Sequence, residues 1–418
     1  MQLDLASIRA QFPALSARDD SRPRIYFDNP AGTQVPRSVV DRIDECLLNA
    51  NANLGGYFAT SCLAGEIVDG ARQAMADFVN AASADEIIFG QNMTSLTFHL
   101  SRSIGRRLEK GDEIIVSRMD HDANVEPWVL LARDRGLTVK WLPFDVESFE
   151  FDLTRLDELL TERTRLVCVG VASNLTGTIN DVAGICERAR AAGAWTYIDA
   201  VQSAPHLLTD VQAMGCDFLV SSAYKFFGPH QGVLWGRGEL LRELESYRVR
   251  PAPAGPPECF EPGTQSHEGM AGTAAAVDYI ASIGAPVSGG ARKPADRREA
   301  LVAAFGLLLE HERRLAARLV DGLEALPGVT VQGITDAAAM NRRLSTVSFT
   351  HHKLAPAKIA EALADRGIFV WSGHNYALEV VKALGILDSG GVVRIGAVHY
   401  NTPEEVDAVL DALSAILR

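Results

Sequence analysis

Short runs of almost entirely apolar residues alternate with helical patterns through the first 280 residues of the chain. Most of these runs show no polar alternation, which is typical of strands buried on both faces of a parallel sheet. Between them, stretches such as 61–81 and 182–193 carry apolar residues three and four positions apart, as amphipathic helices do. The alternation predicts an α/β fold, with a mainly parallel sheet covered by crossover helices on both sides. The expected strands cover residues 86–90, 113–117, 138–144, 166–172, 195–200 and 218–223.

The last third of the chain has a different pattern. Residues 250–269 contain five prolines and cannot hold regular structure for long. A second loop at 284–299 precedes a long helical run that ends near residue 326. The final helix is expected to begin at Thr402, because Pro403 and Glu405 complete a capping box with proline at the first helical position. Together these patterns predict a smaller C-terminal α/β unit. Its strands are expected near 329–333, 343–350, 367–373 and 392–398.

The charge balance and the cysteines exclude several classes of protein. Forty basic residues against 53 acidic ones give a net charge of −13, whereas a nucleic-acid-binding protein needs a basic face. No apolar run approaches the roughly 20 residues that span a bilayer, and the first residues lack the apolar core of a signal peptide. The six cysteines are widely spaced, without a CxxC pair, as in a protein of a reducing compartment. We therefore expect a cytoplasmic enzyme with no nucleic-acid or membrane partner.

Two residues at the ends of expected strands carry the strongest chemical signal. Lys225 closely follows the apolar run 218–223, and lysine is rarely buried without a partner, so its position needs an explanation. Its amine could form a Schiff base with an aldehyde cofactor, although a surface lysine at a strand end would look the same. Asp199 ends the preceding strand, where it could hold a pyridine nitrogen protonated or simply cap a helix. Because ligands of open α/β sheets bind at the carboxyl ends of strands, the two residues could share one site.

Other residues at strand ends are weaker candidates. Asn92, Met93 and Thr94 open a helix after a strand, which makes a natural phosphate site or an ordinary cap. His121 follows another strand and could stack on a flat ring or be structural. Arg394 lies in a strongly apolar strand, where it could bind a carboxylate or form an internal ion pair.

Motifs for nucleotides and metals are missing from the sequence. Neither GxGxxG after the first strand nor GxxxxGK[ST] occurs, so nucleotide binding is disfavoured. HExxH is absent as well. The pairs His311-Glu312 and His351-His352 lack useful metal spacing and are expected at the surface. No metal is expected.

Eight short motifs, taken in order, resemble the class V aminotransferase family of pyridoxal 5′-phosphate (PLP) enzymes, especially its cysteine desulfurase branch. The resemblance extends over about residues 25–410. It implies PLP-dependent fold type I, with a large seven-stranded domain and a smaller C-terminal domain. The implied divisions are an N-terminal arm at 1–25 that packs with the small domain, a large domain at 26–290 and a small domain at 291–418. The motifs are YFDNPAG (26–32), FGQNMTS (89–95), MDHDANVEPW (119–128), SNLTGT (173–178), DAVQS (199–203), SSAYK (221–225), FEPGTQ (260–265) and VRIGAVHYNTPEEVD (393–407).

The resemblance also implies roles for individual residues. Lys225 would form the Schiff base with PLP, Asp199 would face the pyridine nitrogen, and His121 would stack on the ring. Thr264 of one subunit would reach the PLP phosphate of the other, which implies a homodimer. Arg394 would bind the substrate α-carboxylate. The remaining cofactor contacts would come from Met93, Thr94, Asn174, Gln202, Ser222 and Tyr224, and substrate contacts from Asn29, Asn174 and His374.

Two departures from the desulfurase pattern affect the expected reaction. Tyr224 stands before the lysine, where desulfurases usually have histidine and some relatives, such as kynureninases, have tyrosine. The loop that reads roughly Arg-x-Gly-x-x-Cys in desulfurases reads Trp-Ser-Gly-His-Asn-Tyr at 371–376, and no cysteine follows Cys259. Sulfur transfer through a persulfide on this loop is therefore disfavoured. Tyr376 could act in acid–base catalysis, but the preferred interpretation is that it forms a wall of the substrate pocket. A pocket lined by Trp371 and Tyr376 would favour a substrate larger or more apolar than cysteine.

The resemblance predicts an enzyme that acts on a small α-amino acid through an external aldimine and a Cα carbanion. Three fates of the carbanion stay open. The preferred one is elimination, as in a cysteine desulfurase-like C–S lyase that works without a persulfide cysteine. The alternatives are an epimerase similar to isopenicillin N epimerase and an aminotransferase. A non-catalytic protein that keeps PLP as a scaffold is a more remote possibility.

Overall fold

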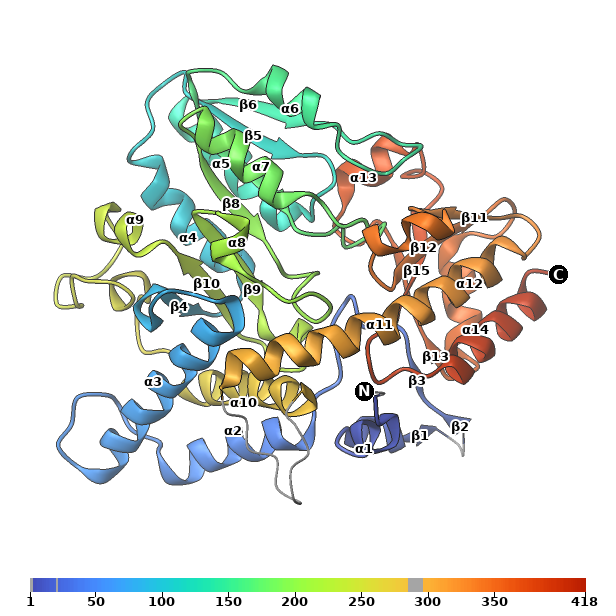
Figure 1. Ribbon diagram of the computed structural model, residues 1–418, viewed down its shortest axis with the longest axis horizontal. Helices are drawn as coiled ribbons and strands as arrows, with labels where there is room; N and C mark the ends of the chain where they lie inside the picture. Colours follow the sequence, from blue (N-terminus) through green and yellow to red (C-terminus); the bar gives the residue numbers. More distant parts are fainter. Residues whose placement is uncertain (1–2, 20–21, 285–295) are drawn as a thin grey trace.

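The computed structural model describes residues 3–19, 22–284 and 296–418. A seven-stranded sheet forms the centre of the larger part (Figure 1), in the order β4-β10-β9-β8-β7-β5-β6. Strand β10 runs antiparallel to both of its neighbours, and the strands from β9 to β6 pair in parallel. The predicted α/β fold with a mainly parallel seven-stranded sheet is confirmed. The strands are β4 (Ile87–Gly90), β5 (Glu113–Ser117), β6 (Thr138–Leu142), β7 (Thr164–Gly170), β8 (Trp195–Asp199), β9 (Phe218–Ser222) and β10 (Gly232–Gly236).

Helices cover both faces of this sheet because alternate side chains of each apolar strand point to opposite faces. On one face, Val167, Ile198 and Leu219 pack in a single cluster with side chains of α3, α7 and α10. On the other, Leu166, Tyr197 and Val220 pack with α4, α5 and α9. The helices of the large part are α2 (Arg37–Asn49), α3 (Ala59–Val79), α4 (Met93–Gly105), α5 (Glu126–Arg135), α6 (Leu153–Leu159), α7 (Val182–Ala191), α8 (Val211–Met214), α9 (Gly238–Glu243) and α10 (His267–Gly284).

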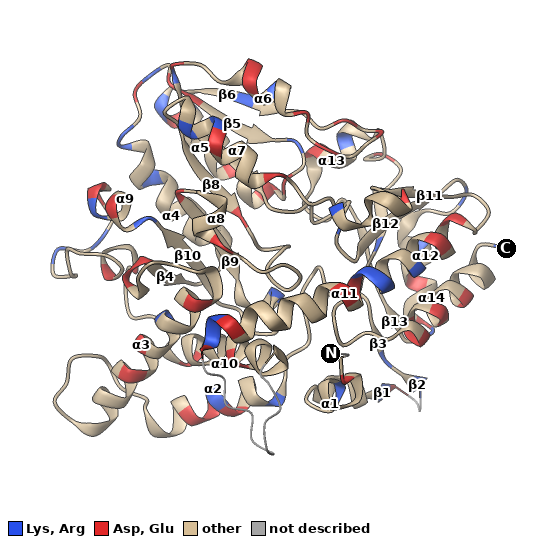
Figure 2. Cartoon of the chain, viewed as in Figure 1, with Lys and Arg blue, Asp and Glu red and all other residues tan. Residues whose placement is uncertain are grey.

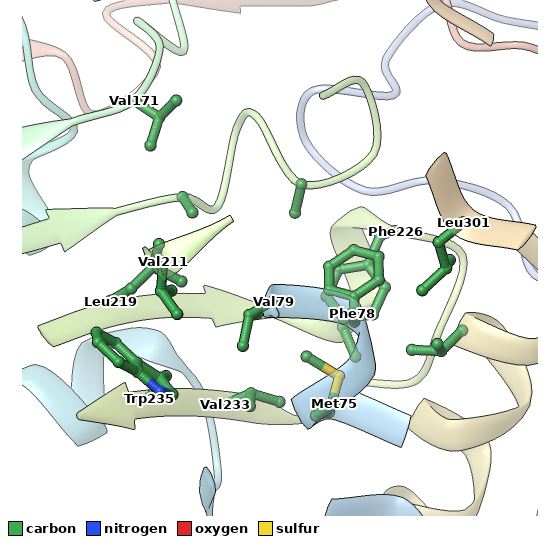
Figure 3. Close-up of a cluster of buried hydrophobic side chains, with 14 of the residues drawn as sticks. Met75, Phe78, Val79, Val171, Val211, Leu219, Phe226, Val233, Trp235 and Leu301 are labelled. Atoms are coloured by element: carbon green, nitrogen blue, oxygen red, sulfur yellow. The ribbon is translucent and has the colours of Figure 1, made fainter. Parts of the chain in front are cut away.

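The long helix α11 (Arg297–Glu324) joins the two parts of the molecule (Figure 1). Leu301 near its start lies in the core of the large sheet (Figure 3), where Phe78 and Phe226 stack with ring centroids 4.9 Å apart. Leu315 and Leu323, further along, pack against the second sheet. The helix therefore ties the second sheet to the first through two different cores.

The second sheet has four strands, in the order β11-β12-β15-β14. One face carries Val347, Val393 and Ile395, which pack under α11, α12 and α14. The capping box at Thr402 and Glu405 is present at the start of α14, as expected. The elements of this part are β11 (Val329–Gln332), β12 (Thr346–His351), α12 (Pro356–Ala364), β13 (Ile368–Phe369), β14 (Trp371–Gly373), α13 (Leu378–Ala383), β15 (Val392–Gly396) and α14 (Pro403–Ile416).

The N-terminal residues contact the C-terminal part of the chain. Strand β3 (Ile25–Tyr26) pairs in parallel with β13, and Arg9 in α1 (Leu5–Arg9) forms an ion pair with Glu405 at 2.9 Å. Two short strands, β1 (Arg18–Asp19) and β2 (Arg22–Pro23), pair antiparallel in a separate sheet. The predicted boundary between residues 290 and 291 falls outside the described residues, and the division at 1–25, 26–290 and 291–418 stays a prediction. Short 3-10 turns occur at Pro13–Ser16, Ala84–Glu86, Asp122–Asn124, Ala223–Lys225, Glu258–Phe260 and Ala337–Arg342.

Two local predictions are wrong. The expected single strand at 367–373 is two strands, because β13 pairs with β3 while β14 pairs with β15. His311 and Glu312, expected at the surface, are buried: His311 Nε2 lies 2.9 Å from the main-chain oxygen of Asn401, and Glu312 Oε2 lies 2.6 Å from His206 Nδ1. A carboxylate inside the protein requires such a partner, and the partner comes from a distant part of the chain.

Charged residues are spread over both parts of the molecule, with acidic and basic side chains intermixed (Figure 2). The acidic excess of the sequence is therefore not confined to a single element. None of the helices in the described ranges is long and apolar enough to cross a membrane.

Candidate active site

A cavity of about 410 Å³ opens at the carboxyl ends of the central parallel strands. Asp199 ends β8, Ser222 ends β9, and Gly170 ends β7, so the register of the sheet brings these three positions to one edge. The predicted convergence at strand ends is thus present. Nine of the residues expected at the site line this cavity: Met93, Thr94, His121, Asn174, Asp199, Gln202, Ser222, Tyr224 and Lys225.

Lys225 stands in the cavity on the short turn that follows β9. Its Nζ donates a hydrogen bond to the main-chain oxygen of Pro30 and lies 5.0 Å from the ring centroid of Tyr224. Among the described residues, none of the carboxylates forms an ion pair with it. Burial, together with the positive charge of Arg394, lowers the pKa of Lys225 to about 7, although Asp199 and Asp28 act in the opposite direction. A large fraction of this lysine is therefore a neutral, nucleophilic amine near neutral pH.

Asp199 is the acid that faces this cavity from the neighbouring strand. It is 8% exposed, and one oxygen accepts a hydrogen bond from the Val201 N–H at 2.8 Å. Burial raises the pKa of Asp199 to about 6, while the Val201 N–H and Lys225 favour the ionised form. A cationic nitrogen placed against this carboxylate would supply the charge that its surroundings lack.

His121 lines the cavity at the end of the segment that follows β5. Its Nδ1 accepts a hydrogen bond from the Ala123 N–H at 3.1 Å, which leaves the proton of a neutral ring on Nε2. Burial, together with the positive charges of Lys225 and Arg394, lowers the pKa of His121 to about 3. The ring is therefore neutral at physiological pH, as suits stacking on a flat ligand.

The N-terminus of α4 lies at another side of the cavity. The Met93 N–H donates to Ser222 Oγ at 3.0 Å, and the Thr94 N–H forms no hydrogen bond with any residue that the structure describes. A Cβ on Gly232 would lie 2.5 Å from the main chain of Asn92, so only glycine in β10 allows this helix end to come so close. Free N–H groups, the helix dipole and two hydroxyls make this end suited to an anion such as a phosphate.

Arg394, in β15 of the second sheet, approaches the same region from the other part of the molecule. It is 4% exposed, and its Nη1 donates to the main-chain oxygen of Asn174 at 2.9 Å. Its buried Nε has no hydrogen-bond partner, and within the described ranges it forms no ion pair. Burial lowers the pKa of Arg394 to about 10, so the side chain stays charged at neutral pH. A buried guanidinium with unused donors is suited to a carboxylate.

Two amides in the cavity have unsatisfied oxygen atoms. Asn174 Nδ2 donates to the main-chain oxygen of Asn375 at 2.7 Å, but its Oδ1 has no partner. Gln202 Nε2 lies 3.0 Å from Thr346 Oγ1, and Oε1 of Gln202 is likewise without a partner. Turning the Gln202 amide over would let the Thr346 hydroxyl donate to Oε1 and would direct the NH₂ group into the cavity.

The other predicted site residues lie outside the set that lines the cavity. His374 and Tyr376 belong to the segment after β14, and the Tyr376 ring stacks on His121 with centroids 5.2 Å apart and planes at 19°. Thr264 is exposed and borders a second cavity, with Asn53 and Arg72. Both polar atoms of the Asn29 amide already form hydrogen bonds within the protein. Nδ2 donates to the main-chain oxygen of Gly396 at 2.7 Å, and Oδ1 accepts from the Tyr400 hydroxyl. As placed, Asn29 offers no free donor to a substrate.

Sequence reasoning missed three residues at this site. Asp120 lines the cavity and accepts hydrogen bonds from Ser117 Oγ and from the Gly170 N–H. His230 also lines it and stacks on Tyr224, with centroids 5.0 Å apart. Asp28 has a buried Oδ1 without a partner, and burial raises its pKa. Asp28 and Asp120 each lie within a quoted motif, 26–32 and 119–128, so a local signal existed for both, whereas His230 lies in none of the eight motifs.

A family model described as aminotransferase class-V matches residues 25–290 and 302–409. The chain belongs to the class V aminotransferase family. Among curated class V relatives, a probable cysteine desulfurase of Streptomyces coelicolor is 33% identical over 433 residues, which cover 99% of this chain and 97% of that protein. The aminotransferase-like protein FGM3 of Gibberella zeae is 34% identical over 424 residues, covering 99% of this chain and 98% of that protein.

Solved structures agree with this fold over the whole length of the chain. The apo structure of a cysteine desulfurase from Thermococcus onnurineus superposes with a TM-score of 0.86 at 28% identity, covering 100% of this chain and 98% of that one. The cysteine desulfurase CsdA of Escherichia coli gives a TM-score of 0.84, also at 28% identity, covering 100% and 99%. The resemblance predicted from the motifs is confirmed, and so is the expectation of fold type I. Class V aminotransferases are PLP-dependent enzymes, so this chain is a member of an enzyme family.

The class V cofactor fits the cavity in three respects. Lys225, which forms no ion pair with the residues described, could link to an aldehyde, and Asp199 at the end of the neighbouring strand could hold a pyridine nitrogen. The N-terminus of α4 offers the Thr94 N–H, which has no partner in the described part of the chain, next to the hydroxyls of Thr94 and Ser222. The orphaned amide of Gln202 borders the same space and supplies a further polar group.

Proposed function

We propose that this protein is a PLP-dependent enzyme that acts on an α-amino acid, with elimination at a carbon–sulfur bond as its reaction. One observation carries the proposal: Lys225 stands in a cavity, forms no ion pair with any described residue, and lies near Asp199 and the buried Arg394. A structural lysine would need a partner for its charge, whereas a lysine with a pKa of about 7 is prepared to react as an amine.

When bound, PLP supplies an aldehyde that links covalently to amines and a protonated ring that withdraws electrons from the amino-acid Cα. Asp199 would hold the proton on the pyridine nitrogen, and the neutral His121 would pack against the ring. The Thr94 N–H, the helix dipole of α4 and the hydroxyls of Thr94 and Ser222 would hold the phosphate. Gln202, with its NH₂ group turned to the cavity, would donate to the phenolic oxygen of the ring.

Arg394 and Lys225 act on the substrate itself. Arg394 binds the α-carboxylate through its free donors, with Asn174 fixing the guanidinium through the 2.9 Å hydrogen bond. This contact orients the amino acid so that its Cα–H bond lies near Lys225. Lys225 Nζ then removes the proton from Cα, and the same amine delivers protons in later steps.

The relatives and the loop composition support elimination as the fate of the substrate. Several relatives are named cysteine desulfurases or probable ones, and this supports breakage of a C–S bond as the reaction. The segment 371–376 contains no cysteine, so no thiol of this loop is available to accept sulfur. In elimination, the Cβ–S bond breaks with its electron pair on sulfur. Water completes the reaction, and the products are a thiol or sulfide, pyruvate and ammonia.

Transamination is the second candidate, favoured by one relative, and epimerisation is the remaining alternative. The FGM3 protein is named aminotransferase-like and matches this chain at 34% identity. Both reactions would use the same Lys225, Asp199 and Arg394 and would differ only in where the proton returns. Product analysis separates the three: pyruvate with ammonia for elimination, a 2-oxo acid that retains the whole side chain for transamination, and the other enantiomer for epimerisation.

We also propose that the enzyme is a homodimer with shared sites. Three observations on the large part support this: Leu48 and Phe58 are 75% and 59% exposed, Tyr57 is fully exposed, and all lie on α2 or just before α3. Exposed apolar side chains grouped in this way are typical of a protein interface. Thr264 is exposed, as a residue that reaches into a partner must be. Light scattering after gel filtration, with Tyr57→Asp as a disruptive variant, tests the dimer.

The proposed reaction is tested with purified protein loaded with PLP. Addition of L-cysteine and of S-substituted cysteines should change the visible absorbance and release pyruvate, ammonia and sulfide or thiol in equal amounts. Arg394→Gln should weaken the spectral response. A loaded protein whose spectrum no amino acid alters would overturn the proposal, and a spectral change without pyruvate would replace elimination by one of the other two reactions.

A further inference from the structure

The segment 371–377 places exposed aromatic rings beside the candidate site. Trp371 and Tyr376 are 52% and 66% exposed, and they are separated by only four residues. Large aromatic side chains at a surface are informative when they adjoin a binding site, since contact with an apolar ligand removes their area from water. Neither side chain is used by the chemistry proposed above.

Trp371 lies next to the carboxylate-binding arginine. It pairs directly with Arg394 across strands β14 and β15, and Ser348 pairs with Arg394 on the other side. Residues directly opposite each other in an antiparallel pair have their side chains on the same face of the sheet. Ser348 Oγ donates to the main-chain oxygen of Leu175 at 2.6 Å, so this face is directed toward the segment that contains Asn174. Trp371 therefore borders the place where a substrate carboxylate binds.

Tyr376 is fixed next to the ring-stacking histidine. Its ring stacks on His121, and its main-chain oxygen accepts from the Asp122 N–H at 2.7 Å. One residue earlier, the main-chain oxygen of Asn375 accepts from Asn174 Nδ2, also at 2.7 Å. Both Asn375 and Tyr376 have left-handed backbones, with φ of 51° and 57°, a conformation that is unfavourable for a bulky residue such as tyrosine. The contacts with the large part of the molecule hold this conformation in place.

We propose that Trp371 and Tyr376 form the binding surface for the substrate side chain, and that the substrate is an α-amino acid carrying a planar apolar group beyond Cβ. This inference rests on the proposed function, because it takes the carboxylate to be at Arg394 and Cα to be near Lys225. A substrate held at those two points extends its side chain past segment 371–376. The thiol of free cysteine is too small to cover two aromatic rings, whereas a phenyl or similar group on sulfur contacts both.

The test is equilibrium binding to the PLP-loaded enzyme, followed by the change in its visible spectrum. We expect S-benzyl-L-cysteine to bind at least about tenfold more tightly than S-methyl-L-cysteine, as a buried ring predicts. Trp371→Ala and Tyr376→Ala should each reduce this ratio to about threefold or less. Tyr376→Phe keeps the stacking ring and should preserve the ratio within about twofold, and Tyr247→Ala, which removes an exposed aromatic ring elsewhere, is the matched control.

The outcomes separate this inference from the proposed function. If amino acids change the spectrum but the two analogues bind equally, the assignment of Trp371 and Tyr376 is wrong while the proposed function stands. The same holds if both alanine variants keep the full ratio, or if Tyr376→Phe loses it, because the hydroxyl rather than the ring would then be the active group. If no amino acid changes the spectrum, the proposed function fails and this inference fails with it.

Discussion

Arg394 Nη1 donates a hydrogen bond to the main-chain oxygen of Asn174 at 2.9 Å, although the two residues are 220 positions apart in the chain. The bond joins the second sheet to the rim of the cavity in the first. It satisfies only one of the five N–H donors of the guanidinium, and the buried Nε remains without a partner. The arginine is thus held in place and still able to bind an anion.

Replacement of Arg394 by glutamine should weaken the binding of α-amino acids. Loss of a charged hydrogen-bonding partner costs about 2–3 kcal/mol, or roughly 30- to 150-fold in the dissociation constant. Spectral titration of the PLP-loaded protein with an amino acid measures this loss. Binding of the matching amine without a carboxylate serves as the control and should change less than about threefold. Equal losses for both ligands would show that Arg394 does not bind the carboxylate.

The rate at which the apoprotein captures PLP should depend on pH through Lys225. Only the neutral amine reacts with an aldehyde, so the rate should rise about tenfold per pH unit below the pKa of about 7 and level off above it. Stopped-flow absorbance between pH 5 and 9 measures the profile.

Two variants should move that profile in opposite directions. Arg394→Gln removes a positive charge that lowers the pKa of Lys225, so the midpoint should shift to higher pH. Asp28→Asn removes a negative charge that raises the pKa of Lys225, so the midpoint should shift to lower pH. A midpoint near the ordinary lysine value in the parent protein, or shifts of the same sign in both variants, would contradict the assignment.

Asp199→Asn should retain PLP but lose most of the activity. The amide cannot hold a proton on the pyridine nitrogen, so we expect kcat to fall by at least about 100-fold, within the range for a lost proton-transfer partner. The visible absorbance band should persist, because Lys225 is intact. Steady-state kinetics with measured PLP content distinguish this result from loss of the cofactor. A kcat within tenfold of the parent value would show that Asp199 does not hold the proton on the pyridine nitrogen.

Glu312→Ala should destabilise the fold. Glu312 and its partner His206 are both buried and lie 2.6 Å apart, so the substitution leaves a polar group without its partner inside the protein. We expect a loss of about 3 kcal/mol in the free energy of unfolding, measured by urea denaturation. Glu310→Ala, two residues earlier on the exposed side of α11, is the matched control and should change it by less than about 0.5 kcal/mol. Equal losses in the two variants would show that the buried Glu312–His206 pair contributes no more to the free energy of unfolding than the exposed Glu310.

The strands and the two principal site residues could be predicted because their signals are local. Apolar runs without alternation mark buried parallel strands, and the strands that end at Asp199 and before Lys225 needed no knowledge of distant contacts. Chain topology then brings those ends to one edge of the sheet. The short strand Gly232–Gly236 has no such signal, since two of its five residues are glycine.

What could not be predicted depends on residues far apart in the chain. The burial of Glu312 requires His206, 106 positions away, and the stack between His121 and Tyr376 joins two parts of the molecule. The division of 367–373 into two strands likewise depends on Ile25 and Arg394 as separate partners. The local sequence pattern of a segment does not show which distant segment packs against it.

The most direct test of the account is to locate the covalent link between the protein and PLP. Purified protein is incubated with PLP, reduced with borohydride, digested and mapped by mass spectrometry, with the Lys225→Ala variant treated in parallel and its folding checked by circular dichroism. The account predicts a single adduct, on the peptide that contains Lys225, and no adduct in the folded Lys225→Ala protein. An adduct on another lysine, or a parent protein that takes up no PLP, would contradict it.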